Sequence, residues 1–373
     1  MASGQWSVNA KPQAIYTILF FPTVYRLLPT AYPPMADAPE QNLKAPLRRL
    51  TGVRVIGTGS FLPEPVVRNE DLTQYGCDPQ WIFERSGIRE RRHAPPGVYT
   101  SDLAVAAARK ALDRAGVAAG DIDLLVLGTF TPDLPVPSTA CQVQHKLGLR
   151  CPAFDVSAAC AGFVYALVTG SQFVGTGCSR TALVIGADTT SRIVEPQDKK
   201  TYPLFGDGAG AVLLARGSEE QGLIAYTMGS DGSGEDVLCM KAGGSRRPTS
   251  AETVERREHY MRMEGRSVFK WAIRVIDRSV RDVLEHAKLT TDDVDLVVLH
   301  QANVRILDAA AEELDIDRRK IFVNLEKYGN TSAGSIPLAL DEAVQQGRIR
   351  RGSNVLVCGF GAGLAWGTAL WRW

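Results

Sequence analysis

The chain carries one pattern twice, about 172 residues apart. Leu112–Gly128 (LDRAGVAAGDIDLLVLG) and Leu284–His300 (LEHAKLTTDDVDLVVLH) share a helix end, a polar turn and an apolar strand, and 284 − 112 = 172. The same offset sets Cys160-Ala161-Gly162 against Ser332-Ala333-Gly334, since 332 − 160 = 172. Strands that alternate with helices in this way predict two similar α/β halves, and similar halves are expected to pack about a pseudo-twofold axis.

The repeat also sets the domain boundaries. Ala182–Gly186 matches Val355–Gly359 at an offset of 355 − 182 = 173, one residue more than in the other matched segments. We therefore place the first half at residues 51–222 and the second half at residues 223–373. Residues 1–50 lie outside the repeat and are rich in proline, and their apolar stretch 14–21 is too short to span a bilayer. We expect residues 1–50 to be an N-terminal extension outside the fold. A transit or signal-like segment is one interpretation of its beginning, but we favour upstream sequence before a true start at Met35.

Cys160 occupies a place that suits a nucleophile. It follows the apolar segment 153–156, lies among small residues and precedes the helix-like stretch 163–167. Such a strand-to-helix turn leaves the sulfur uncrowded, and the N-terminus of the following helix favours a thiolate. A buried and inert cysteine explains the turn equally well, because free cysteines are among the most buried residues.

The two halves differ where chemistry would occur. The first half has Cys160 where the second has Ser332, and the second has His300 where the first has Gly128. His300 ends an apolar strand and opens a turn, the place where open α/β sheets carry ligands. Asn330 lies two residues before Ser332. We hypothesise that Cys160, His300 and Asn330 converge near the pseudo-twofold axis.

Four segments together resemble a known family. They are AACAGF around Cys160, LHQAN around His300, YGNTSAGSIPLAL around Asn330, and the terminal GFGAGLAWGTAL. In this order they are similar to β-ketoacyl-[acyl-carrier-protein] synthase III, a thiolase-fold condensing enzyme, from about Val53 to the C-terminus. The resemblance implies a layered αβαβα core and a catalytic triad of Cys160, His300 and Asn330.

The family's reaction gives each residue a role. Cys160 would take the acyl group from an acyl-CoA, and decarboxylation of malonyl-[acyl-carrier-protein] would supply the carbanion that makes a 3-oxoacyl product and initiates fatty acid synthesis. His300 Nε2 and the Asn330 amide would stabilise the enolate oxygen. The resemblance also implies a second oxyanion hole, built from the backbone N–H groups of Cys160 and Ala362. No metal or cofactor is implied, because CoA is a substrate.

The CoA end has its own residues. Trp81 and Arg85 share a helix face at i,i+4 spacing, and in the family such a pair grips the adenine. Without the resemblance, a surface helix with one buried indole is the better interpretation. Lys199 replaces an arginine that is common in the family. A lysine keeps the positive charge but cannot form the paired hydrogen bonds that a planar guanidinium makes with phosphate. Further CoA contacts are implied for Lys199, Gly265, Phe269, Asn303 and Arg305.

Partners follow from the same resemblance. Carrier proteins are acidic, so a basic patch is expected at the tunnel mouth, and Arg305 with Lys270 could begin it. Acidic residues at 312, 313 and 315 oppose docking there, so we hypothesise a patch at Arg318, Arg319 and Lys320. A homodimer is expected, in which Val136 of the second subunit closes the acyl pocket. The modest size of Val136 predicts room for starters larger than acetyl.

Composition argues against a protein that binds nucleic acid or an anionic membrane, and against a disulfide-rich protein. The chain has 42 Lys and Arg against 41 Asp and Glu, which leaves no charge excess for nucleic acid or an anionic membrane. Its seven scattered cysteines fit a reducing compartment better than a disulfide framework, so we expect a cytoplasmic enzyme. The glycine run 205–210 precedes a strand and lacks a following Lys-Ser/Thr, so it predicts a tight turn between strands and not a nucleotide loop.

Other readings of the triad are also considered. A papain-like hydrolase lacks its usual nucleophile motif here and leaves the repeat unexplained. A thiolase needs a second cysteine, and Cys358, the one candidate, lies in an apolar strand and is expected to be core. A chalcone-type or other secondary-metabolite condensing enzyme stays open as an alternative. So does a non-catalytic protein of this fold that only binds acyl-CoA.

Overall fold

The structure is a computed structural model that describes residues 45–373. Met35 and the apolar stretch 14–21 lie outside the described residues. The described residues form one unit, within which the two halves are packed together. None of the helices within residues 45–373 is long and apolar enough to cross a membrane.

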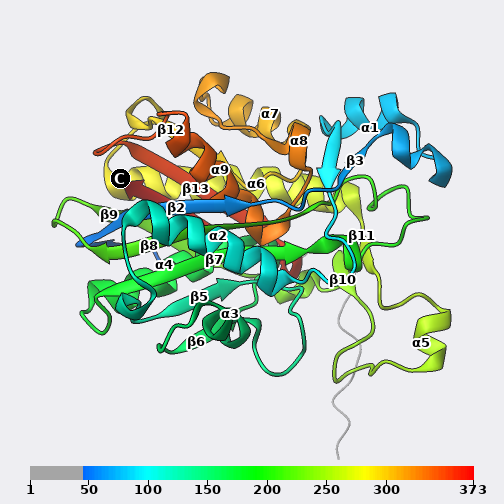
Figure 1. The fold of residues 1–373 in the computed structure, drawn as a ribbon. Helices are drawn as coiled ribbons and strands as arrows, with labels where there is room; N and C mark the ends of the chain where they lie inside the picture. The colour runs from blue at the N-terminus through cyan, green and yellow to red at the C-terminus, as the bar shows by residue number, and fades with distance from the viewer. Residues whose placement is uncertain (1–44) are drawn as a thin grey trace, which may run out of the picture. The chain divides into compact units, whose positions relative to one another are not determined.

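Two five-stranded sheets with the same plan form the frame (Figure 1). The strands of the first sheet, in spatial order, are β2 (Val53–Phe61), β8 (Asp207–Arg216), β7 (Thr181–Thr189), β5 (Leu125–Gly128) and β6 (Ala153–Val156). Those of the second are β1 (Arg48–Thr51), β9 (Gly222–Gly229), β14 (Ala365–Arg372), β13 (Asn354–Gly361) and β12 (Leu296–Leu299).

The pairing pattern is duplicated. In the first sheet β8 is antiparallel to β2 and β7, and β5 is parallel to β7 and β6. In the second sheet β14 is antiparallel to β9 and β13, and β12 is parallel to β13. A single parallel bridge from Val297 to Ile321 stands in the place of β6. The repeat in the sequence is therefore a repeat in topology.

Helices complete the layers. The main ones are α2 (Thr100–Ala115), α3 (Thr139–Leu147), α4 (Gly162–Gly175), α6 (Gly265–Ala287), α7 (Val304–Glu313) and α9 (Ser335–Gln345). Helix α4 has no charged residue, as expected of a helix buried on all sides, and with α9 it fills the core between the sheets. Helices α2 and α3 cover the outer face of the first sheet, and α6 and α7 cover that of the second. In Figure 1, α7 lies at the top and α3 at the bottom. This is the predicted αβαβα core.

Smaller elements surround one end of the sheets. Strands β3 (Val66–Arg68) and β4 (Glu90–Arg92) form a hairpin that carries α1 (Pro79–Ser86), and β10 (Leu238–Met240) and β11 (Met261–Met263) form another that carries α5 (Ala251–Glu255). The short helix α8 (Leu325–Tyr328) precedes Asn330.

One predicted boundary is too late, because Ala45 and Leu47 already pack against the core of the second half. Strand β1 pairs antiparallel with β9, with Arg48 opposite Tyr226, so residues 48–50 belong to the fold and not to the extension. This strand also crosses the predicted division, because a segment from the start of the chain extends the sheet of the second half. The glycine run was also misread in part, since Asp207–Gly210 already belongs to β8 and is extended strand, not turn.

The sequence offset also needs correction. The short turn η3 (Ala159–Ala161) corresponds to η8 (Ser332–Gly334), and 332 − 159 = 173. Helices α4 and α9 begin with the same spacing, since 335 − 162 = 173. Ser332 is therefore the counterpart of Ala159, and Cys160 corresponds to Ala333. Both Ala159 and Ser332 have positive φ, at 45° and 51°.

The two turns cross between the halves. A Cβ atom on Gly186 of β7 would lie 2.2 Å from the carbonyl oxygen of Ala333 in η8. A Cβ atom on its counterpart Gly359 of β13 would lie 3.0 Å from Cα of Ala161 in η3. Each turn thus rests on a strand of the other half, and the approach is close enough at Gly186 to exclude any side chain and leaves little room for one at Gly359. The crossing brings η3 and η8 together at the pseudo-twofold axis.

Candidate active site

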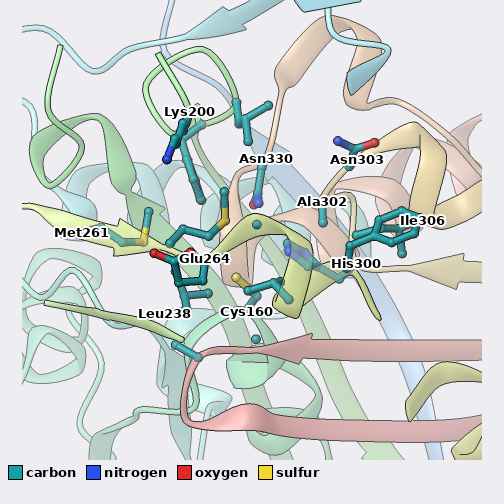
Figure 2. Close-up of a pocket in the computed structure, with 18 of the residues that line it drawn as sticks. Cys160, Lys200, Leu238, Met261, Glu264, His300, Ala302, Asn303, Ile306 and Asn330 are labelled. Atoms are coloured by element: carbon teal, nitrogen blue, oxygen red, sulfur yellow. The ribbon is translucent and has the colours of Figure 1, made fainter. Parts of the chain in front are cut away.

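A cavity of about 620 Å³ opens at the ends of β12 and β13 and reaches the two crossed turns. Cys160, His300 and Asn330 all line it, and Figure 2 shows their side chains gathered at its centre. The size suits a small-molecule substrate. The residues expected to bind CoA or to form the second oxyanion hole also line this cavity: Trp81, Arg85, Lys199, Gly265, Phe269, Asn303, Arg305 and Ala362.

Cys160 is the middle residue of η3, the turn that directly precedes α4, and only 6% of its surface is exposed. The Ser332 hydroxyl donates a hydrogen bond to its Sγ at 3.4 Å. Burial raises the pKa of the Cys160 thiol to about 12, while the Ser332 hydrogen bond acts in the lowering direction. We expected the N-terminus of the helix to favour a thiolate, but desolvation of the sulfur outweighs the hydrogen bond. At neutral pH the residue is therefore a thiol before substrate binds.

His300 follows β12 and is 1% exposed. Its Nδ1 lies 2.7 Å from Oγ of Ser335, and its ring meets the edge of Phe360 with centroids 5.3 Å apart. Burial lowers the pKa of His300 to about 3, so the imidazole is neutral near pH 7. With Nδ1 engaged, Nε2 is the ring atom that can act in the cavity.

Asn330 is fixed by backbone and side chain. Its N–H donates to the Leu204 carbonyl at 2.8 Å, and its carbonyl accepts from the Gly206 N–H at 3.0 Å. Its Oδ1 accepts from the Ser332 N–H at 2.8 Å. Because Oδ1 is engaged in this way, Nδ2 is the atom that can donate into the cavity.

The glycine loop after β13 approaches the cysteine closely. A Cβ atom on Gly361 would lie 2.9 Å from the Cys160 backbone nitrogen, so position 361 has no room for a side chain. Ala362 begins η9 (Ala362–Leu364), and the positive φ values of this turn fall on Gly363 and Leu364, at 76° and 40°. An alanine at position 362 is therefore unstrained, and its backbone N–H follows directly after the glycine that contacts Cys160.

The mouth of the cavity carries the residues expected to bind CoA. Asp78 caps α1 by accepting from the Trp81 N–H at 2.6 Å, and the Arg85 guanidinium carbon lies 5.7 Å from the centre of the Trp81 ring. Trp81 is 47% exposed, so its indole is not a core residue. Asn303 caps α7 through the Arg305 N–H and donates from Nδ2 to the Arg85 carbonyl at 3.1 Å. It thereby links α7 to α1.

Sequence reasoning missed several lining residues. Lys200 and Arg266 add two cations beside Lys199 and Gly265, and Glu264 adds a carboxylate. Apolar side chains line the left of Figure 2, opposite Asn303 and Ile306 on the right. Leu238 and Met261, which are labelled there, come from the β10–β11 hairpin, and the hairpin also contributes Met263 to the lining. Ser332 and Ser335 lie in the segment YGNTSAGSIPLAL, which contributes to the resemblance. Nothing in their spacing predicted that they would contact Cys160 and His300.

Other residues lie away from the cavity. Cys358 is fully buried in the core of the second half, as expected, where it accepts a hydrogen bond from Thr368 at 3.1 Å. Val136 is 82% exposed and does not line the cavity of its own chain. The hypothetical docking patch is already engaged. Arg318 pairs with Asp308, Arg319 pairs with Asp317, and Lys320 donates to two backbone carbonyls.

The duplicated αβαβα core, with a cysteine turn crossing the axis toward a strand-end histidine, defines a thiolase-fold condensing enzyme. Two family models agree with this: "3-Oxoacyl-[acyl-carrier-protein (ACP)] synthase III" matches residues 154–232, and the model of its C-terminal part matches residues 284–373. The β-ketoacyl-[acyl-carrier-protein] synthase III of Rhodopirellula baltica is 54% identical over 87% of this chain and 99% of its own length.

Solved structures give the same result. That of 3-oxoacyl-[acyl-carrier-protein] synthase III from Aquifex aeolicus has a TM-score of 0.80 and 42% identity, and the match covers 86% of this chain and all of the other. The priming β-ketosynthase of the R1128 polyketide pathway also has a TM-score of 0.80, with 35% identity, over 89% of this chain and 98% of its own.

The chain belongs to the β-ketoacyl-[acyl-carrier-protein] synthase III family. The predicted family, fold and enzyme class, an acyltransferase of the condensing type, are confirmed. So is the predicted reaction at the level of the family: an acyl-CoA is condensed with malonyl-[acyl-carrier-protein], which initiates fatty acid synthesis.

Proposed function

We propose that this chain performs the condensation through an acyl-cysteine intermediate on Cys160. The observation that supports it is that Cys160, His300 and Asn330 line one cavity whose mouth carries Trp81 and Arg85. A CoA thioester that enters past the mouth would therefore reach the sulfur. The reaction requires neither a metal ion nor a cofactor.

In the first half-reaction the sulfur of Cys160 attacks the thioester carbonyl. The tetrahedral oxyanion would be held by the backbone N–H groups of Cys160 and Ala362, each worth roughly 3–4 kcal/mol in comparable sites. The C–S bond to CoA then breaks, and the proton of the Cys160 thiol ends on the CoA sulfur. Proton balance is thus kept, which matters because the buried thiol is protonated at neutral pH.

In the second half-reaction malonyl-[acyl-carrier-protein] loses CO2. The electrons of the broken C–C bond form an enolate, whose oxygen would accept hydrogen bonds from His300 Nε2–H and Asn330 Nδ2. The carbanion carbon attacks the acyl-cysteine, a new C–C bond forms, and Cys160 leaves and is reprotonated from solvent. The product is a 3-oxoacyl-[acyl-carrier-protein].

Lys199, Asn303 and Arg305 would contact the phosphates and pantetheine of CoA, together with Gly265 and Phe269, and Lys200 and Arg266 would reinforce the charge. A methionine-lined wall at Met261 and Met263 would contact the acyl chain.

The carrier protein would dock on the exposed edge of α6. Arg266, Lys270 and Arg274 follow one another at i,i+4 spacing and are exposed, and they form no ion pair within residues 45–373. Arg266 also lines the cavity, so the row leads from the mouth along the helix. An acidic carrier fits such a row better than the paired Arg318 and Arg319. Lys270→Glu would raise KM for malonyl-[acyl-carrier-protein] but not for malonyl-CoA, whereas Arg318→Glu would change neither.

We also propose a cytoplasmic homodimer. All seven cysteines are free, which fits a reducing compartment. Strand β6 leaves one edge of the first sheet unpaired within residues 45–373, and Leu134 and Val136 nearby in the chain are 50% and 82% exposed. Such an edge and loop suit a second copy of the chain. Sedimentation at micromolar concentration would give the mass of a dimer, and a monomer would refute this part.

Mass spectrometry of the protein after incubation with a panel of acyl-CoAs tests the main proposal. Acylation confined to the Cys160 peptide, and lost in Cys160→Ser but not in Cys141→Ser, would support it, since Cys141 is exposed and remote in sequence. No acylation by any acyl-CoA would favour an acyl-CoA-binding role or a condensing enzyme loaded from a carrier. Condensation with the polyketide carrier only would favour a secondary-metabolite enzyme, for which the R1128 likeness speaks.

A further inference from the structure

The contact between His300 and Ser335 joins the end of β12 to the first residue of α9. Both residues are buried, at 1% and 2% exposed, and Nδ1 and Oγ are 2.7 Å apart. A second donor reaches the same oxygen, because the Gln301 N–H points at Ser335 Oγ from 3.4 Å. The Ser335 hydroxyl therefore already accepts one hydrogen bond and has its own proton to place.

The repeat shows that the fold does not need this pair. By the offsets above, Gly128 is the counterpart of His300 and Gly162 is the counterpart of Ser335. In the first half these two positions are packed backbone to backbone, and a Cβ atom on Gly128 would lie 2.6 Å from the Gly162 carbonyl carbon. In the first half, the strand-to-helix junction is thus formed with glycine at both of these positions and without a side-chain contact between them. The second half carries two polar side chains there, and they are bonded to each other.

The imidazole is neutral, so it carries one proton, and the Ser335 contact decides on which nitrogen. If Ser335 donates to Nδ1, the ring proton is on Nε2 and faces the cavity. If Ser335 accepts from Nδ1–H, Nε2 faces the cavity as a lone pair and could take the proton of Cys160. The Gln301 N–H favours the first arrangement, because it leaves the hydroxyl proton free to point at Nδ1.

We propose that Ser335 is a positioning residue that donates to Nδ1 of His300 and so keeps the ring proton on Nε2, as a donor to the substrate. This rests on the proposed function, which assigns that donor to the enolate oxygen. Acyl transfer to Cys160 does not use Nε2–H, whereas decarboxylation does. Ser335 therefore acts on the second half-reaction and not on the first.

Ser335→Ala is expected to lower decarboxylation of malonyl-[acyl-carrier-protein] by up to about a hundredfold to a thousandfold, the range for one lost donor in such sites. Acylation of Cys160 by acyl-CoA is expected to stay within about twofold of the parent. Ser335→Thr keeps a hydroxyl and should restore most of the decarboxylation. Ser279→Ala is the matched control, because Ser279 is a buried helical serine that bonds to Thr368 in the core and does not line the cavity. It should change neither half-reaction.

The tautomer itself can be read without any turnover. Nitrogen-15 NMR of protein labelled in its five histidines, with the His300 signals assigned by their loss in His300→Gln, should show a protonated Nε2 and a bare Nδ1. Ser335→Ala should move the proton toward Nδ1. This measurement on the parent protein decides the matter even if the variant does not fold.

Two results would overturn the inference: a ring proton on Nδ1 in the parent protein, or a parallel loss of acylation and decarboxylation in Ser335→Ala. The second would make His300 the base that activates Cys160. If the parent protein accepts no acyl group at all, the proposed function fails instead, and the NMR result still reports the tautomer.

Discussion

The hydroxyl of Ser332 donates a hydrogen bond to the sulfur of Cys160 at 3.4 Å, and the two residues come from different halves of the chain. The bond forms because η3 and η8 cross at the axis. It acts, together with a backbone hydrogen bond of Cys160 itself, against the burial that raises the pKa of the Cys160 thiol to about 12. The second half therefore tunes the nucleophile of the first.

Ser332→Ala is expected to raise the pKa of Cys160 further. A hydrogen bond of this kind contributes about 1 kcal/mol, which is about 0.7 pKa unit. Alkylation of Cys160 by iodoacetamide at a fixed pH between 8 and 10 should therefore slow by about fivefold. Cys141 and Cys178 are exposed and serve as internal standards in the same sample. An unchanged ratio of Cys160 to Cys141 alkylation would mean that the contact does not stabilise the thiolate.

The crossing of the turns predicts that alanine is tolerated at some glycines of the chain and not at those where the turns meet. Gly186→Ala places a Cβ atom 2.2 Å from the Ala333 carbonyl oxygen, so the two halves must separate locally. Overpacking of this kind costs about 1–3 kcal/mol of unfolding free energy. The matched control is Gly120→Ala, because its added Cβ meets nothing within 4 Å and its φ is negative. Urea unfolding should show a lower midpoint for Gly186→Ala only, and equal midpoints for the two variants would refute the close crossing.

Burial of His300 predicts an acid-dependent loss of stability. Its pKa is about 3 in the folded protein and 6.5 in the reference state, so the unfolded chain binds a proton first as the pH falls. The stability contribution of the neutral imidazole is present above pH 6.5 and is lost as the pH falls toward 3. The parent protein should lose up to about 1.4 kcal/mol more per pH unit in this window than His300→Gln.

The measurement is the unfolding free energy in urea at several pH values between 7 and 4. Carboxylates also titrate in this range, so the difference between the two proteins is the informative quantity. Parallel curves for the parent protein and His300→Gln would show that the imidazole is protonated without penalty in the folded state.

The sequence predicts features of this fold that depend on local pattern. The apolar run before Cys160 and the small residues around it give a strand and a turn wherever they are placed, and the strand that ends at His300 carries its own signal. The repeat then gives the second half from the first. The layered αβαβα core, the roles of the triad and the CoA-binding residues came instead from the resemblance to the synthase III family.

What the sequence missed depends on contacts between segments that are distant in the chain. The pairing of β1 with β9 joins Arg48 to Tyr226 and carries no local signature. The extra residue before η8 changes the counterpart of Cys160 from Ser332 to Ala333, and the bounds and the positive φ of the two turns reveal it. The raised pKa of Cys160 comes from its burial, a tertiary effect that outweighs the helix terminus expected from the turn.

The last prediction concerns the nucleotide end of the substrate. Trp81 is 47% exposed, and the Arg85 guanidinium carbon lies 5.7 Å from the centre of its ring, so the indole can stack on a flat base with a cation beside it. Stacking of a base on an aromatic ring is worth about 1–3 kcal/mol, so Trp81→Ala should raise KM for acyl-CoA by about fivefold to 150-fold. The rate at saturation should be preserved, because the ring is remote from Cys160 along the cavity.

An acyl-pantetheine thioester, which lacks the nucleotide, separates this effect from a distorted helix. The parent protein and Trp81→Ala should acylate Cys160 from it at the same rate, since neither can use the clamp. A slower reaction of Trp81→Ala with acyl-pantetheine would instead show that the indole supports α1 and the shape of the mouth. In that case the base is bound elsewhere, and Lys200 and Arg266 become the residues to test for the phosphates.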